Sequence, residues 1–266
     1  MTTATRSLPA GRGSSAIRRY LPPLLVFVAV LIIWELGTGG AGRRVLPPPS
    51  AIVDAAIAEQ QTLIKSTIAT FYEAIGGLLI GTLLGVAVAF AAARWIIARD
   101  VMLPFAVAAS AIPIIAIAPI LNNWFGVLSP VSKMAMAALL VFFPMVINVT
   151  RGLVEVHPSS LELMRSYAAN PGDVLRKVRV PNALPFFFTA LKVGTTLAFI
   201  GAVVGEYFGG TSEVLGQFVL TNMSSGSFDV AWAAILVGAI TAILAYVFVS
   251  IVERAVLPWQ SLQKEP

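Results

Sequence analysis

The stretch SSLELMRSYAANPGDVLRKVRVPNALP, residues 159–185, is the longest polar segment in a sequence that is otherwise strongly apolar. A hydroxyl of Ser159 or Ser160 is expected to cap a helix that begins near Leu161, because a side-chain oxygen satisfies a free backbone N–H at a helix N-terminus. Pro171-Gly172 is expected to break this helix. The stretch therefore predicts a short helix, a turn and a basic connector, which carries Arg165, Arg176, Lys177 and Arg179.

The composition around this stretch is that of an integral membrane protein. Hydrophobic residues make up 58% of the 266 positions and charged residues 12%, whereas an ordinary soluble domain has about 25% charged residues. The mean hydropathy is +0.86. The net charge of +5 is spread between apolar runs and forms no patch suited to a nucleic acid. No cysteine is present, and a single histidine, His157, has no second histidine with which to complete a metal site.

The apolar runs predict an all-α protein with six transmembrane helices. An N-terminal tail, residues 1–20, is expected to be disordered, residues 21–258 form the membrane domain, and residues 259–266 form a second tail. An amphipathic surface helix is expected over residues 51–65. The transmembrane helices are expected at residues 21–36, 66–93, 101–121, 131–150, 186–207 and 229–252.

Two of the predicted helices carry a face of small residues. Gly77, Gly81 and Gly85 recur every four positions, so they lie on one side of the second helix. Small residues in lipid allow helices to approach closely. The sixth helix has a comparable face, formed by Ala231, Ala234, Gly238, Ala242 and Ala245.

The distribution of lysine and arginine predicts the orientation in the membrane. If the six helices are correct, 13 basic residues lie on the side of the termini and of residues 159–185, and 4 lie on the other side, among them Lys133 in an external loop. Cytoplasmic segments carry the excess of basic residues. Both termini and the polar stretch are therefore expected in the cytoplasm.

Three ionisable residues fall within or near the predicted helices, where charges are costly and usually face protein or water. Glu73 and Lys192 are far apart in sequence, and a pair between them is geometrically possible. The alternative is that Lys192 extends toward the cytoplasm and that Glu73 pairs with backbone or water. Glu206 is expected either at the outer mouth of a pathway or solvated at the interface.

The motifs that would give this chain its own catalytic chemistry are missing from the sequence. It has no Gly-rich loop ending in Gly-Lys-Ser/Thr, no Gly-x-Ser-x-Gly and no His-Glu-x-x-His. Any energy from ATP must therefore arrive from another subunit. The natural docking point is the polar helix at residues 160–171.

The polar stretch resembles the cytoplasmic coupling loop of ATP-binding-cassette (ABC) importer permeases. The family signature reads EAA, three residues, Gly, nine residues, Ile, one residue, Leu-Pro. With its Gly on Gly172, the second Ala falls on Ala168 and Leu-Pro on Leu184-Pro185, and these match. Three positions depart from the signature, where Ser166 replaces Glu, Tyr167 replaces the first Ala and Asn182 replaces Ile.

Further stretches resemble the permease branch that serves sulfonate, taurine, nitrate and thiamine-precursor importers. NNWFG, ELMRSYAA and RVPNALPFFFTALKVG are most similar to permeases for riboflavin or pyrimidine-type vitamin precursors. The stretches that carry the branch resemblance are IIWEL at 32–36, LPPPS at 46–50, AIPIIAIAPILNNWFG at 111–126, FFPMVINVTRGL at 142–153, GAVVGEYFGG at 201–210, Glu253-Arg254 and Pro258-Trp259.

The resemblance implies a type I importer permease in the inner membrane of a prokaryote. Two copies would form the pathway, two ABC ATPase subunits holding ATP and Mg²⁺ would dock below, and an external solute-binding protein would deliver the solute. This chain would itself bind no cofactor. The residues expected to meet the ATPase are Glu162, Arg165, Ser166, Tyr167, Ala168, Ala169 and Gly172.

The resemblance also suggests residues for the solute path, at the interface of the two permeases. Aromatic and amide side chains suit a neutral heterocycle, whereas an anion such as sulfonate or nitrate would need Arg or Lys, and the spans offer only Lys192. A self-contained secondary transporter and an assembly subunit of a membrane complex remain alternatives. The candidate path residues are Ser110, Pro113, Asn122, Asn123, Trp124, Glu206 and Tyr207.

Overall fold

The computed structural model describes residues 12–38, 45–94 and 104–261, with side chains for residues 21–38, 45–94 and 104–259. This part of the chain is helical and contains no strand. The helices are α1 (Arg12–Thr38), α2 (Pro49–Ala58), α3 (Gln60–Arg94), a short helix Pro104–Ser110, α5 (Ile114–Phe125), α6 (Pro130–Val154), α7 (Pro158–Ser166), α8 (Pro171–Val174), the π-helical turn η1 (Leu175–Arg179), α9 (Val180–Phe208), α10 (Leu215–Ser225), α11 (Phe228–Val256) and α12 (Pro258–Ser261).

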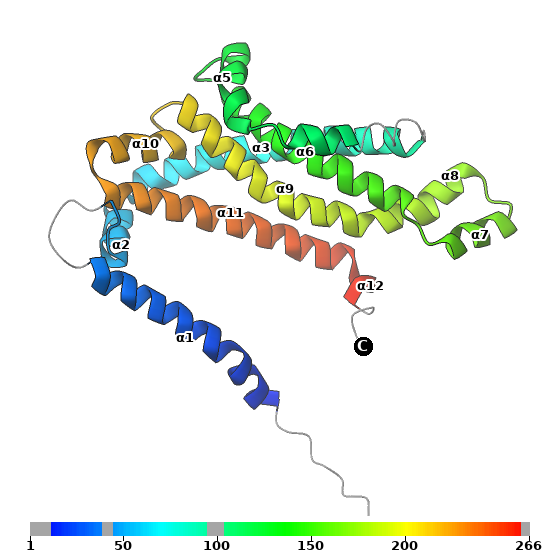
Figure 1. The fold of residues 1–266 in the computed structure, drawn as a ribbon, viewed down its shortest axis with the longest axis horizontal. Coiled ribbons are helices and arrows are strands. Elements are labelled where there is room, and N and C mark those ends of the chain that lie inside the picture. The colour runs from blue at the N-terminus through cyan, green and yellow to red at the C-terminus, as the bar shows by residue number, and fades with distance from the viewer. Residues whose placement is uncertain (1–11, 39–44, 95–103, 262–266) are drawn as a thin grey trace, which may run out of the picture.

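The core of the molecule is a bundle of α3, α6 and α9, which run side by side (Figure 1). The glycine face of α3 packs directly on α6, as predicted. A Cβ atom added at Gly77 would lie 2.3 Å from the Ala137 Cβ, and one added at Gly81 would lie 2.5 Å from the Ala138 carbonyl oxygen. The backbones of α3 and α6 therefore approach each other as closely as glycine allows.

Helix α11 covers the bundle along α9. The predicted small-residue face is confirmed, because Ala231 is buried, Ala234 is buried against α2 and α10, and Ala242 and Ala245 pack on the core of the bundle. Gly238 faces α10, where an added Cβ would meet the Leu215 Cδ1 at an ordinary 3.4 Å.

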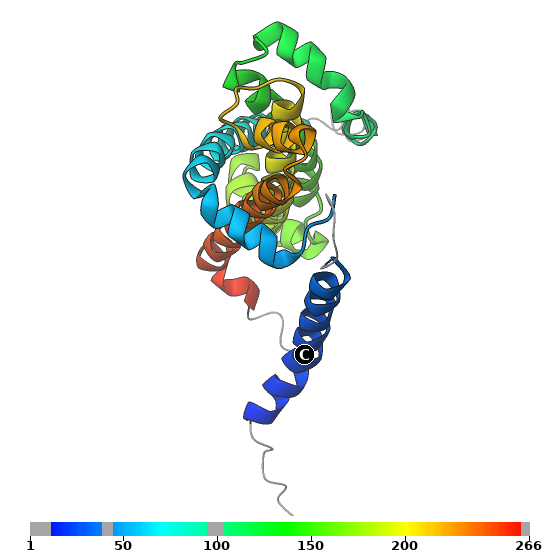
Figure 2. The ribbon, with the colours of Figure 1, turned by 90° about the vertical axis from the view of Figure 1, so that its left-hand side faces the viewer.

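Helix α1 stands apart from the bundle (Figures 1 and 2), and none of its residues from 21 to 38 is buried. Its end is tied to the rest of the chain by Trp34, whose Nε1 donates to the Pro47 carbonyl over 3.0 Å and whose ring contacts Trp232. The helix begins at Arg12, within the N-terminal tail expected over residues 1–20, and residues 1–11 lie outside the described part. The apolar run from residue 21 extends its helix backward through residues that tolerate helical geometry.

The predicted third helix, residues 101–121, is also wrong as a single span. The chain forms two helices, Pro104–Ser110 and α5, that meet at 87°; residues 101–103 lie outside the described part. Pro113 is at the bend because proline has no N–H to donate and disfavours helical geometry in the residue before it. The described helices provide five apolar spans, and six if this bent pair is counted as one span.

Three other boundaries differ from the prediction. The amphipathic helix expected over 51–65 is divided at Glu59, and its second half belongs to α3. Helix α9 begins at Val180 and continues from η1 without a break, so Pro185 lies inside it. The segment between the fifth and sixth predicted helices, residues 208–228, contains helix α10.

Candidate functional site

The polar stretch that opens the sequence analysis forms a helical projection at one end of the bundle, opposite α10 (Figure 1). Helix α7 begins at Pro158, and the capping position is His157. The expected capping by Ser159 or Ser160 is therefore wrong. Proline at the first helical position has a fixed φ suited to the helix and has no N–H that needs a cap. The Ser159 hydroxyl is instead paired with the His157 Nδ1 over 2.7 Å.

The turn after α7 differs from the predicted Pro171-Gly172 break. Helix α7 ends at Ser166, and Ala168 has a φ of +49°, a left-handed conformation that is unfavourable for a residue with a Cβ. Asn170 then caps α8, because its Oδ1 accepts the Asp173 N–H over 2.9 Å. Pro171 and Gly172 thus begin a helix. An added Cβ at Gly172 would meet only the Asn170 Oδ1, at 3.2 Å, so the permease's own packing does not require glycine there.

The residues expected to meet an ATPase lie on the surface of this projection. Two large apolar side chains, Leu163 and Tyr167, are 57% and 76% exposed. They are four positions apart, so they share one face of the α7 turn. The two side chains form a small apolar surface on an otherwise polar segment. Of the seven expected residues, Glu162, Arg165, Ser166, Tyr167, Ala168 and Gly172 are exposed, and Ala169 is partly buried.

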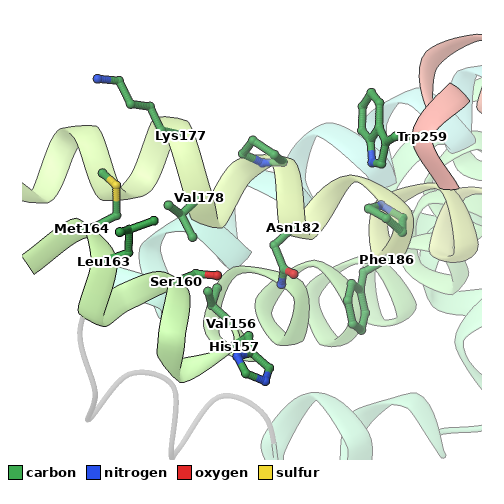
Figure 3. A pocket seen from close by; sticks show the side chains of 12 residues that line it. Val156, His157, Ser160, Leu163, Met164, Lys177, Val178, Asn182, Phe186 and Trp259 are labelled. Atoms are coloured by element: carbon green, nitrogen blue, oxygen red, sulfur yellow. The ribbon is translucent and has the colours of Figure 1, made fainter. Parts of the chain in front are cut away.

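A cavity of about 500 Å³ separates α7 from the start of α9 and from α12 (Figure 3). Its wall is mixed in polarity, with Ser160, Asn182 and Trp259 among the lining side chains. Asn182 stands where the family signature has Ile, and its Nδ2 donates to the carbonyl oxygens of Gly152, over 2.8 Å, and Glu155, over 3.2 Å. Asn182 therefore connects the start of α9 to the end of α6, next to the helical projection.

Lys192 pairs with Glu253 and not with Glu73, so the pair considered from the sequence is wrong. The Lys192 Nζ lies 2.7 Å from the Glu253 Oε2, and the two side chains are 22% and 16% exposed. The contact joins α9 to the cytoplasmic end of α11. It spans 61 sequence positions, which is why the spacing of charges does not reveal it.

We expect Lys192→Met to destabilise the protein by about 2 kcal/mol, less than the roughly 3–5 kcal/mol for a fully buried pair, because Glu253 is left without its partner. The double variant Lys192→Met/Glu253→Gln should regain most of this loss. Thermal unfolding in detergent measures both. If the effects of Lys192→Met and Glu253→Gln, each measured alone, add up in the double variant, the two groups do not interact in the membrane protein.

Three charged residues converge inside the other end of the bundle. Glu73 of α3, Lys133 of α6 and Glu206 of α9 are 5%, 1% and 0% exposed. The Lys133 Nζ donates to the carbonyl oxygens of Val127 and Ser129 at the start of α6. Glu73 and Glu206 lie close enough to interact electrostatically with each other and with Lys133. Lys133 is thus a core residue, whereas the sequence places it in an external loop.

The structure gathers only some of the candidate path residues, since the Asn122 Nδ2 lies 3.0 Å from where a Cβ on Gly209, at the end of α9, would be. Ser110 and Pro113 are exposed at the bend before α5. Asn122, Asn123 and Trp124 lie at the far end of that helix, which is roughly 18 Å long at 1.5 Å per residue. Asn122 is buried while Trp124 is 71% exposed. Glu206 is buried in the charged cluster, and Tyr207 lines a groove between α9, α10 and α11.

An apolar helical bundle with a polar helical projection at one end is the architecture of a multi-pass membrane protein. The chain belongs to the family described as the binding-protein-dependent transport system inner membrane component, which matches residues 77–261. It is therefore a multi-pass protein of the prokaryotic inner membrane.

Similar proteins carry names from the same class. A probable ABC transporter permease protein of Haemophilus influenzae is 35% identical over 82% of this chain and 89% of its own. The formylaminopyrimidine transport permease protein ThiX of Halalkalibacterium halodurans is 32% identical over 91% and 97%. The riboflavin transport system permease protein RibX of Chloroflexus aurantiacus is 29% identical over 96% and 99%.

The fold has also been solved in a related assembly. A chain from inward-facing conformations of the MetNI methionine ABC transporter superimposes with a TM-score of 0.56, covering 74% of this chain and 94% of its own at 20% identity. At that identity the likeness establishes the fold alone.

Proposed function

We propose that this chain is the membrane-spanning subunit of an ATP-driven importer for a heterocyclic vitamin or vitamin precursor. The observation that carries the ATP-driven part is the exposed apolar pair Leu163 and Tyr167 on the α7 projection. A partner protein could bury this pair, and the sequence has no nucleotide-binding loop of its own. Family membership names the class of partner.

The assembly that follows has three kinds of partner. Two ABC ATPase subunits bind ATP and Mg²⁺ and press on the α7 projection. A second copy of this chain completes the pathway, so that the permease is a homodimer. A solute-binding protein delivers the solute at the opposite end of the bundle.

Two lines of support favour a neutral heterocycle over an anion. Both lysines that lie inside the described bundle are engaged, Lys192 with Glu253 and Lys133 with two carbonyl oxygens. A sulfonate or nitrate would need a cation that is available to it. In addition, the relatives named for a formylaminopyrimidine and for riboflavin are 32% and 29% identical to this chain, against 27% for one named for aliphatic sulfonates.

The test begins with gentle solubilisation of the tagged chain from native membranes and identification of the proteins that co-purify. An ABC ATPase and a solute-binding protein are expected. The complex is then placed in liposomes and tested for uptake of riboflavin, formylaminopyrimidine, taurine and nitrate. Uptake that continues without any ATPase would contradict the proposal and favour a self-contained transporter. A stable complex that has no ATPase would favour an assembly subunit.

A further inference from the structure

The buried cluster of Glu73, Lys133 and Glu206 does not balance its own charge. Two ionised glutamates and one ionised lysine would leave a net charge of −1 among side chains that are at most 5% exposed. Within the described part of the chain, Lys133 is the only lysine or arginine that interacts electrostatically with either carboxyl group. Because a buried charge without a partner is costly, the cluster needs one further positive charge.

The Lys133 ammonium group cannot meet both carboxylates, because most of its donors are already engaged. Its Nζ donates to the carbonyl oxygens of Val127 and Ser129, which uses two of its three N–H groups. Its stem packs on α9 beside Glu206, where a Cβ added at Gly205 would lie 3.1 Å from the Lys133 Cγ. One N–H group and one positive charge therefore remain for two carboxyl groups.

Glu206 is the carboxyl group toward which the other donors point. The Gly216 N–H donates to its Oε2 over 2.7 Å. The Thr70 hydroxyl is close enough to hydrogen-bond to the Glu206 carboxyl group. Because the Thr70 Oγ1 accepts the Leu215 N–H over 3.0 Å, its own proton is free to be donated. This surrounding of donors suits an ionised carboxylate, which can only accept hydrogen bonds.

Glu73 approaches Glu206 from α3 and has no comparable donors. It lies three positions after Thr70, so the two share one face of the helix. The Glu73 and Glu206 carboxyl groups are close enough for a hydrogen bond between them. Within the described residues, however, the Glu73 Oε2 and the Glu206 Oε1 have no donor. Two carboxylates cannot hydrogen-bond to each other, whereas one proton would supply both the donor and the positive charge.

We propose that this cluster is a binding site for one proton, which Glu73 carries and donates to Glu206. Glu206 is then the carboxylate, Lys133 balances its charge, and the cluster is neutral. Helix α10 contributes backbone N–H groups to the site and has no titratable side chain over Leu215–Ser225. The site links α3, α6 and α9 to the start of α10, and it does not depend on the proposed transport function.

A bound proton makes the stability of the folded protein depend on pH in a defined direction. An unfolded glutamate loses its proton near about pH 4.3. At neutral pH the folded protein therefore holds one proton more than the unfolded chain, so its stability falls as the pH rises, until the folded protein releases the proton. In that range the ratio of unfolded to folded protein rises by about tenfold per pH unit.

The test compares the unfolding constant of wild type and Glu73→Gln in mixed detergent micelles, from about pH 6 to about pH 8. Glu73→Gln imitates the protonated acid, because its amide donates to Glu206 and carries no charge. We expect the wild-type constant to rise relative to that of Glu73→Gln by about tenfold per pH unit. Glu213→Gln removes an exposed carboxylate three positions before Gly216 and is the matched control, whose constant should keep a fixed ratio to wild type.

Two further measurements test where the proton lies. The infrared difference spectrum between wild type and Glu73→Gln at neutral pH should contain the carbonyl stretch of a protonated carboxyl group, which a carboxylate lacks. Glu206→Gln should unfold with a constant about tenfold larger than that of Glu73→Gln. Its amide offers one acceptor oxygen in place of two, so Gly216 and Thr70 compete for it.

The outcomes separate the proton from its alternatives. A fixed ratio of wild type to Glu73→Gln across this pH range would overturn the proton site. Equal unfolding constants for Glu73→Gln and Glu206→Gln would overturn the assignment of the proton to Glu73. Replacement of sodium by choline at constant pH should leave wild type unchanged, and a loss of stability that Glu73→Gln does not share would assign the missing charge to sodium. If Glu73→Gln does not fold, a wild-type spectrum without a protonated-carboxyl band at neutral pH overturns the site equally.

Discussion

Gly81→Leu is expected to abolish accumulation of folded protein in the membrane, and Gly81→Ala to destabilise it by about 1–3 kcal/mol or more. A Cβ at this position lies 2.5 Å from the Ala138 carbonyl oxygen and 2.8 Å from the Val141 Cβ. Both atoms belong to a packed helix with little freedom to move. The substitution therefore separates α3 from α6, the contact on which the rest of the bundle is built.

The expected loss of stability in Gly81→Ala is opposite in sign to the effect that helix propensity alone predicts. In an unobstructed helix interior, alanine is about 0.8–1.0 kcal/mol more favourable than glycine. Gly238→Ala is the matched control, because its Cβ meets a neighbour only at 3.4 Å. Thermal unfolding in detergent, followed by size-exclusion chromatography, should show a lower midpoint for Gly81→Ala and no loss for Gly238→Ala. Equal midpoints for the two would contradict the close α3–α6 contact.

The features that the sequence predicts well depend on local pattern. Apolar runs locate α3, α6, α9 and α11 to within a few residues at most ends, because burial in lipid or in the bundle needs continuous apolar surface. The four-residue spacing of Gly77, Gly81 and Gly85 predicts a packing face because helical periodicity alone places them together.

The features that the sequence does not predict depend on residues that are distant along the chain. The position of Lys133 in the sequence predicts an external loop. In the structure the residue lies in α6, and its Nζ donates to the carbonyl oxygens of Val127 and Ser129. Glu253 is a helix-end residue by position and becomes the partner of Lys192 only when α9 and α11 pack. A polar or charged residue inside an apolar run indicates that a buried polar contact exists, but the sequence does not reveal which residue is the partner.

Helix α10 is a further feature that local sequence does not predict, because the composition of its segment is that of a loop. Its neighbours are glycines and serines, and its N-terminal hydrogen bonds are satisfied by Glu206 and Thr70 from other helices. Local propensity therefore predicts a turn where tertiary contacts support a helix. The residues expected to meet the ATPase come from resemblance to a family signature and stay a prediction; the structure shows that six of the seven are exposed.

Tyr167→Ala is expected to weaken binding of the ATPase about 30-fold and to lower ATP-driven uptake in proportion. Tyrosine is enriched among the residues that dominate protein interfaces, where truncation costs about 2 kcal/mol or more, and every 1.4 kcal/mol is about tenfold in affinity. The side chain is 76% exposed in the isolated permease. Its removal therefore costs the permease's own fold little, and the loss falls on the complex.

Tyr72→Ala is the matched control for this experiment. Tyr72 is 65% exposed on α3, so the same atoms are removed at a similar exposure but away from the α7 projection. Binding of the purified ATPase to each permease variant in lipid nanodiscs gives the two dissociation constants, and thermal unfolding confirms that both variants remain folded. Equal affinity of the ATPase for the two variants would remove Tyr167 from the docking surface. A large loss with Tyr167→Ala alone would place the ATPase contact on the exposed side of the α7 turn.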